Sequence, residues 1–192
     1  MGGKRRQSGQ SVVELSLSIP VLLTMLFGML NIGVLITDKV IAAYAARQGA
    51  RLAAELGDGL ISNMNTLQID QNVVGTVRAS AANLAYATLT EIDIYQASQA
   101  APVSGASCVV STLGPANGSF DSTTQPYDSY DGTPQANQLH QGFLNTARMQ
   151  VPPCETSIGV NLKWKYTTPT GYQALSLTLL DYAVMKAAPV LG

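Results

Sequence analysis

A run of 23 residues without a charged side chain, residues 15–37, constrains this 192-residue chain more than any other feature. Glu14 precedes the run and Asp38 follows it. As an α-helix, such a run is about 34 Å long, and the hydrocarbon core of a bilayer is about 30 Å thick. The sequence therefore predicts a transmembrane span over about 15–37.

The residues on either side of the run predict its orientation and the length of its helix. The basic residues Lys4, Arg5 and Arg6 precede the span, and few positive charges follow directly. By the positive-inside rule, we expect the N-terminus in the cytoplasm and everything after residue 38 across the membrane. A secretory signal peptide has a shorter apolar region, and here helix-forming residues continue to Gly57. We expect one helix over 14–56, about 65 Å long and twice what a bilayer needs.

Four residues in this helix are unusual for a simple anchor. Glu14 places a carboxylate near the hydrocarbon. A charge costs roughly 2.5–3.5 kcal/mol at mid-membrane, so a carboxylate close to it needs a partner. Pro20 removes a backbone hydrogen bond and kinks or loosens the helix, and Gly28 and Gly33 allow close helix approach. The alternative for each residue alone is an interfacial Glu, or the ordinary frequency of Pro and Gly in membrane spans. The combination favours a role beyond anchoring.

Several blocks of residues in and before this helix resemble the TadE-like pseudopilins of bacterial tight-adherence (Tad) pilus systems. The blocks are Gly9-Gln10-Ser11-Val12-Val13-Glu14-Leu15, Ile19-Pro20-Val21-Leu22-Leu23, Phe27-Gly28, Asn31-Ile32-Gly33 and Ala45-Ala46-Arg47-Gln48-Gly49-Ala50-Arg51. The resemblance covers about residues 8–56. It implies a membrane-inserted, pilin-like subunit cut by a prepilin peptidase between Gly9 and Gln10, with Glu14 as the carboxylate of processing and assembly. Gln10 at the new N-terminus departs from the usual pattern.

Composition excludes several function classes. Eleven basic and twelve acidic residues give a net charge of −1, so no basic field exists to hold nucleic acid. One His and two Cys cannot build a histidine-rich or four-cysteine metal site, and no Ser-His-Asp order or carboxylate pair stands out. We therefore expect no enzyme, no metal and no cofactor.

The part after the long helix predicts a second helix followed by strands. Asn65 and Gln68 resemble a capping box, and apolar residues then recur at helical spacing, which indicates a helix over about 66–88. The apolar residues in question are Leu67, Val74, Val77, Ala81 and Leu84. Alternating patterns predict strands at 90–95 and 158–166, and a third from 175 toward 185 with a bulge at Leu179-Leu180.

These elements predict an α+β fold, in which a long transmembrane helix precedes a small head of one helix and an antiparallel sheet. The turn residues 168–171 join the last two strands as neighbours. Val160, Leu162 and Trp164 share one face of the middle strand. On the polar side, Glu91 and Asp93 are expected to face Lys163 and Lys165, although a solvated face explains them as well.

A stretch rich in Gly, Ser, Asp, Pro and Tyr, residues 98–149, is expected to form a long loop insertion in the head. Tyr127 and Tyr130 are candidates for adhesive contacts, and surface filler is the alternative. Because Cys108 and Cys154 are the only cysteines and both lie on the expected oxidising side, we predict that they form a disulfide.

The expected organisation is thus a leader at 1–9, a long helix at 10–56 and an exported head at 57–192. This organisation favours a pilin-like structural subunit for surface attachment. The role of a minor pseudopilin is favoured over that of a bulk filament subunit. Its expected partners are the membrane, other pilin subunits, prepilin peptidase and the pilus assembly machinery. Before assembly it would lie in the inner membrane, and afterwards in a surface pilus. The rival is a signal-anchored periplasmic or surface binding domain that never enters a filament.

Overall fold

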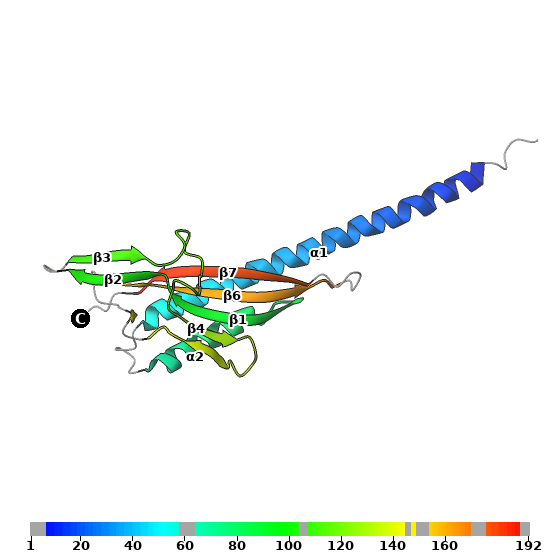
Figure 1. The fold of residues 1–192 in the computed structure, drawn as a ribbon. Helices are drawn as coiled ribbons and strands as arrows, with labels where there is room; N and C mark the ends of the chain where they lie inside the picture. The colour runs from blue at the N-terminus through cyan, green and yellow to red at the C-terminus, as the bar shows by residue number, and fades with distance from the viewer. Residues whose placement is uncertain are drawn as a thin grey trace, which may run out of the picture.

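The computed structural model describes residues 7–57, 64–103, 107–144, 147–148, 154–169 and 176–188. The basic residues of the expected leader, Lys4, Arg5 and Arg6, lie outside this part. Within it, a long helix leads into a small α+β head, as the sequence predicts (Figure 1).

The first helix, α1 (Gln7–Leu56), starts seven residues earlier than expected and ends where Gly57 was expected to stop it. It runs through Pro20 as one continuous helix (Figure 1). Polar side chains in its N-terminal half bond their own backbone: the hydroxyls of Ser16, Ser18 and Thr24 donate to carbonyls three or four residues earlier, at 2.8 Å. Each hydroxyl is therefore satisfied inside the helix, which lowers its cost in an apolar environment.

The second helix, α2 (Thr66–Ala81), is shorter than the predicted 66–88. Its start is as predicted, because Asn65 and Gln68 form both bonds of the capping box. Its end differs because the backbone N–H groups of Ala85 and Tyr86 donate to the Asp38 carboxylate of α1, at 2.9 and 3.2 Å. That capping leads the chain into the first strand instead of a further helical turn.

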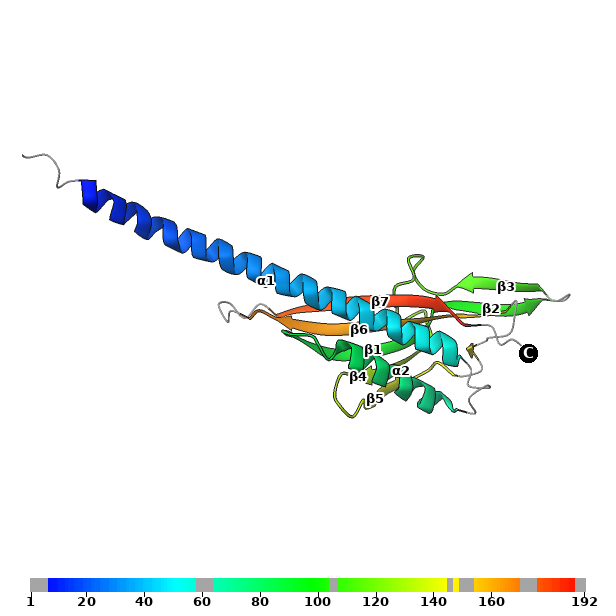
Figure 2. The ribbon, with the colours of Figure 1, turned by 180° about the vertical axis from the view of Figure 1, so that it is seen from behind.

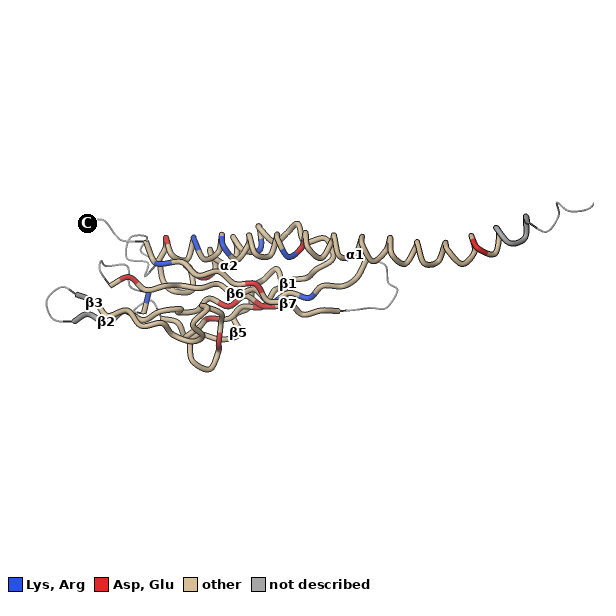
Figure 3. The backbone as a smooth tube through the Cα atoms, turned by 90° about the horizontal axis from the view of Figure 1, so that it is seen from above, with Lys and Arg blue, Asp and Glu red and all other residues tan. Residues whose placement is uncertain are grey.

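The head contains a five-stranded antiparallel sheet of order β5-β4-β1-β6-β7 and a separate hairpin, β2–β3. The strands are β1 (Ala87–Gln96), β2 (Ser98–Val103), β3 (Ser107–Thr112), β4 (Tyr127–Asp131), β5 (Gln138–Gln141), β6 (Ser157–Thr167) and β7 (Ser176–Lys186). Both helices cover the same face of the five-stranded sheet (Figures 2 and 3).

Two expectations about strands were wrong. The stretch 98–149 is not one long loop, since it supplies β2, β3, β4 and β5. These strands are short and do not alternate apolar with polar residues as the other strands do. The bulge at Leu179-Leu180 is absent, because β6 and β7 pair without a shift from Ser157 to Thr167. Regular pairing places Asp181 on the helix side, where it accepts a hydrogen bond from the Trp164 indole at 3.0 Å.

A stripe of small residues lets α1 lie close to the sheet and α2. Its buried members are Ala42, Ala45, Ala46, Gly49, Ala50, Ala53 and Ala54. They repeat every three or four residues and therefore share one helix face. A Cβ on Gly49 would overlap a methyl of Val77, so only glycine allows α2 this close. Val160, Leu162 and Trp164 share one face of β6, as predicted, and all three are fully buried.

Candidate functional site

The N-terminal half of α1 is exposed and apolar. Every large apolar side chain between residues 12 and 30 is exposed: Val12, Val13, Leu15, Leu17, Ile19, Val21, Leu22, Leu23, Met25, Leu26, Phe27, Met29 and Leu30. A surface this large and apolar is covered by lipid or by other apolar surfaces. The helix is long and apolar enough to cross a membrane, and its apolar half projects away from the head (Figure 1).

Contacts between α1 and the head begin at Asn31, which lies inside the predicted span. The Tyr166 hydroxyl donates to the backbone carbonyl of Asn31 at 3.1 Å, and Val34 and Leu35 pack against a small core that contains Trp164. The exposed apolar half, residues 12–30, is therefore about 28 Å long, close to the thickness of a bilayer core. Within the predicted span, Asn31, Val34 and Leu35 therefore contact the head.

Apart from the two cysteines, the predicted site residues lie on this half of α1 or close to its ends. Gly9 and Gln10 belong to its first turns, and Glu14 is one turn after Gln10. Pro20 is exposed, and a Cβ at Gly28 or Gly33 would meet nothing within 4 Å. The surface around both glycines is thus open to another helix.

The structure explains the residue pattern of 45–51, the last of the blocks that resemble TadE-like pseudopilins. Ala45, Ala46, Gly49 and Ala50 belong to the small-residue stripe, whereas Arg47 and Arg51 are exposed. Arg51 pairs there with Glu55 at 2.8 Å. The block therefore packs α1 onto the head, and the blocks before it lie on the exposed half.

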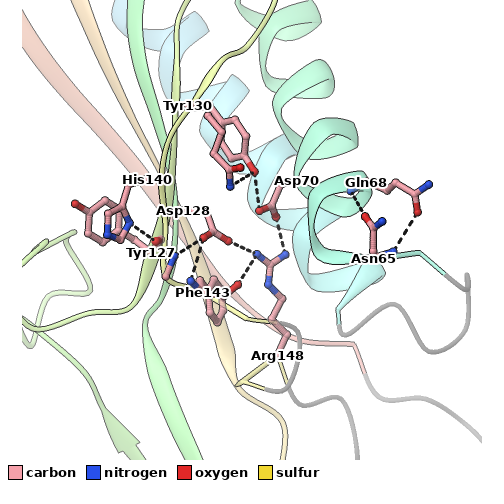
Figure 4. A network of polar contacts seen from close by, with 11 residues as sticks. Asn65, Gln68, Asp70, Tyr127, Asp128, Tyr130, His140, Phe143 and Arg148 are labelled. Atoms are coloured by element: carbon pink, nitrogen blue, oxygen red, sulfur yellow. Dashed lines mark hydrogen bonds and ion pairs between the residues drawn. The ribbon is translucent and has the colours of Figure 1, made fainter.

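A buried ion cluster in the head was not predicted. Arg148 has no exposed surface and donates to Asp70 of α2 at 2.7 Å and to Asp128 of β4 at 2.9 Å (Figure 4). The Tyr130 hydroxyl donates to the other oxygen of Asp70 at 3.0 Å. Tyr130 is therefore a core residue and not an adhesive contact.

The same cluster holds the chain that follows β5. Asp128 accepts from the backbone N–H groups of Gly142 and Phe143, at 2.8 and 3.0 Å. The guanidinium of Arg148 lies 4.4 Å from the centre of the Phe143 ring (Figure 4). The cluster thus fixes the segment around Phe143 and Arg148 to α2 and β4, and its role is structural.

We expect this cluster to make stability depend on pH. Burial raises the pKa of Asp70 to about 7 from an ordinary value near 3.8, although Arg148 opposes the shift. A carboxyl whose pKa is raised by folding contributes stability that is complete below pH 4 and is lost as the pH rises through 7. The free energy of unfolding should therefore be lower at pH 7.5 than at pH 5. Asp70→Asn should reduce this difference, as measured by chemical unfolding.

Glu155→Gln is the matched control for that measurement. Lys186 lowers the pKa of Glu155 by donating a hydrogen bond to it, so this carboxyl titrates below the pH window tested. The control should keep the difference between pH 5 and pH 7.5. An Asp70→Asn variant with the wild-type pH dependence would contradict the assignment to Asp70.

Cys108 and Cys154 form the predicted disulfide, across 46 positions of the sequence. It joins β3 to the chain just before β6. Cross-linking a loop of this length restricts the unfolded chain by about 4 kcal/mol in the chain-entropy model. We expect the Cys108→Ser, Cys154→Ser double variant to lose up to about that much unfolding free energy. Two alkylatable thiols in unreduced, denatured wild-type protein would contradict the bond.

The predicted charge pairing on the sheet holds in part. Lys163 pairs with Glu91 at 3.2 Å, as expected. Asp93 accepts a hydrogen bond from the Asn161 amide at 2.9 Å and does not face Lys165, whose partner in the register is Thr88. Within the described residues, no three His, Cys, Asp or Glu side chains are placed to hold a metal ion.

Comparison with known proteins places the N-terminal helix in a family. Residues 9–51 match the family of TadE-like proteins, and the rest of the chain lies outside the match. Neither the curated proteins nor the solved structures gave a significant match. The matched segment contains the whole exposed half of α1 and most of the stripe that joins it to the head. Through this segment, the chain is similar to the TadE-like proteins.

Proposed function

We propose that this protein is a pilin-like structural subunit of a Tad-type pilus, acting as a minor pseudopilin in surface attachment. One observation carries the proposal: a single continuous helix has an exposed apolar half at 12–30 and a second half bound to the head, and the family match spans both. A filament subunit needs both halves, because one must leave the bilayer and pack on other helices while the other carries the head.

The minor role is favoured over that of a bulk subunit by the size of the head. The resemblance implies that main Tad pilins are mostly short chains, whereas about two thirds of this chain follows the helix. The proposed partners are the membrane, other pilin subunits, the prepilin peptidase and the assembly machinery. We propose an inner-membrane protein with its N-terminus in the cytoplasm, which later joins a surface pilus. The disulfide supports an exported head.

Within the filament, Glu14 is proposed to act between subunits. Cleavage after Gly9 would create an amine on Gln10, one helical turn from Glu14. A neighbouring subunit shifted along the axis would bring its amine to this Glu14, and the charge pair would set the register. Pro20, Gly28 and Gly33 would then lie where neighbouring helices approach.

The first test is processing. We expect the mature envelope form to begin at Gln10, which removes Lys4, Arg5 and Arg6 and leaves eight basic against twelve acidic residues, a net charge of −4. N-terminal sequencing or mass spectrometry measures this directly. Gly9→Val should block the cut, and Gly3→Val, the same change inside the leader, should not. An intact Met1, or a cut beyond residue 30, would contradict the proposal.

The rival function is a signal-anchored binding domain that never enters a filament, and location discriminates between the two. Mass spectrometry of sheared surface material should find the protein with pili. If it stays entirely in the membrane fraction while pili assemble normally, the rival gains support.

A further inference from the structure

Strand β7 forms one edge of the five-stranded sheet, where it pairs with β6 alone (Figure 1). The Ala187 N–H donates to the Thr156 carbonyl at 2.8 Å, so residue 187 faces β6. Residues of an antiparallel strand alternate between facing the partner strand and facing away from it. The even-numbered residues 178–186 therefore point their N–H and C=O groups outward. Among the described residues, no hydrogen bond to these outward groups is found.

Strand β7 also lacks the usual protection of an edge strand. Proteins protect such edges with proline, β-bulges or charged side chains. The 11 residues of β7 contain no proline and pair with β6 without a register shift. Its charged side chains have partners inside the head: Asp181 accepts from the Trp164 indole at 3.0 Å, and Lys186 pairs with Glu155 at 2.7 Å. An edge of this kind is a template for a further strand.

A cavity of about 510 Å³ lies against the C-terminal part of this edge. Four consecutive residues of β7, 182–185, line it. Because successive side chains point to opposite faces of a sheet, a cavity lined by all four lies at the edge of the strand and not over one face. Arg47 of α1 and residues 116–118 also line the cavity. The Tyr182 hydroxyl donates to the Asn117 carbonyl at 3.3 Å and so holds that segment beside the edge.

The side chains along the edge indicate what an added strand would carry. On the face opposite the helices, β7 exposes Leu180, Tyr182 and Val184. Among the described residues that line the cavity, Arg47 is the only charged one. It is exposed and forms no ion pair with the part of the chain that the structure describes. An added strand would thus place apolar side chains on one face and a carboxylate beside Arg47 on the other.

The direction of β7 argues against a second copy of this chain as the added strand. Leu179 lies in the same small cluster as Val34 and Leu35, and the Ala188 N–H donates to the Ala54 carbonyl at 2.9 Å. Strand β7 therefore runs in the same direction as α1. Two-fold pairing of two β7 edges would be antiparallel and would point their exposed α1 halves in opposite directions. Two copies inserted in one membrane cannot pair in that way.

We infer that the edge of β7 binds an extended segment of another protein, which adds to the sheet as a further strand. The segment alternates apolar and polar side chains and carries an Asp or Glu that pairs with Arg47. The choice of another protein over a second copy rests on the proposed membrane insertion. The mode of binding rests on the head alone.

A displayed library of random peptides about as long as β7, selected on the full chain in phospholipid nanodiscs, tests this. Empty nanodiscs remove peptides that bind lipid. We expect enriched peptides that alternate apolar and polar residues and share an Asp or Glu at one polar position. Val184→Pro should weaken binding of the best peptide about tenfold or more, because proline removes an outward N–H that donates to the added strand. Val184→Thr keeps this N–H and should bind within about threefold of wild type.

A charge exchange tests the pairing with Arg47. Arg47→Glu should weaken binding of the acidic peptide about fivefold. Replacing the acidic residue of the peptide with Lys should restore binding to this variant and weaken binding to wild type. Arg51→Glu is the matched control, since Arg51 is an exposed arginine of the same helix that does not line the cavity. It should bind the acidic peptide within about twofold of wild type.

Near-UV circular dichroism verifies that each variant is folded. If Val184→Pro does not fold, two peptides that are N-methylated at alternate amides decide: one should lose binding and the other should keep it, because every second amide faces β7. The inference is overturned if no peptide is enriched over empty nanodiscs, if folded Val184→Pro binds like wild type, or if Arg47→Glu and Arg51→Glu behave alike. A dimer of the chain that Val184→Pro dissociates would identify a second copy as the occupant and also overturn it. Peptide binding requires no pili, so its failure leaves the proposed function intact.

Discussion

Glu14→Gln should leave the protein in the membrane at its normal level, with a folded head, yet absent from pili. Glu14 lies in the exposed apolar half of α1, between the exposed side chains of Val13 and Leu15. Removing its charge lowers the cost of insertion, so poor membrane entry cannot explain a loss of function. The loss would report a missing pairing with the Gln10 amine of a neighbour, or a missing contact with the assembly machinery.

The experiment compares membrane level, leader cleavage and pilus incorporation in wild type and variant. Ser18→Ala is the matched control: Ser18 is one turn away, and its hydroxyl donates only to the carbonyl of Glu14 in the same helix. It should enter pili normally. If Glu14→Gln is processed, present at the normal level and found in normal pili, Glu14 is an interfacial residue and the anchor rival gains most support.

Arg148→Ala should lower the free energy of unfolding by about 3–5 kcal/mol, because it leaves buried carboxylates without their cation. Asp70 and Asp128 have no exposed surface and share this guanidinium. Chemical unfolding of the full chain in detergent micelles measures the loss. Adding Asp70→Asn to Arg148→Ala should restore part of the stability, since one of the two buried charges is then gone.

Arg51→Ala provides the comparison with an exposed pair. Its partner Glu55 lies at 2.8 Å, similar to the buried distances, but both side chains are at least half exposed. The loss should be about 1 kcal/mol or less. Equal losses for Arg51→Ala and Arg148→Ala would contradict the importance of burial for the cluster.

Local signals in the sequence predict the parts of the fold that local forces form. The long helix follows from an uninterrupted run of helix formers, and the start of α2 from a capping box. Strands β1 and β6 follow from the alternation of apolar and polar residues, because the apolar residues of each strand share the face that packs in the core. The end of α2 could not be predicted, since it depends on Asp38, 47 residues before Ala85.

The parts that sequence reasoning missed depend on contacts between distant residues. Arg148 meets Asp70 across 78 positions, and nothing in the neighbourhood of either residue signals the other. The regular pairing of β7 was missed because Asp181 breaks the apolar pattern, and its reason is the indole of Trp164 on the next strand. One hint of the cluster is in the sequence, because Arg148 is the single Lys or Arg between residues 98 and 149.

The bonds of Asn31 and Asp38 to the head have a mechanical consequence. They join the head to α1 where the exposed half ends, so the rest of the helix and the head form one rigid body. In the proposed membrane-inserted form, this body would pivot at the membrane surface. The helix continues about 38 Å beyond Asn31. If the spanning half tilts by 20°, a common value for membrane helices, the far end of this body moves sideways by about 13 Å. Small rotations of the helix among its neighbours would thus become large displacements of the surface that the head presents.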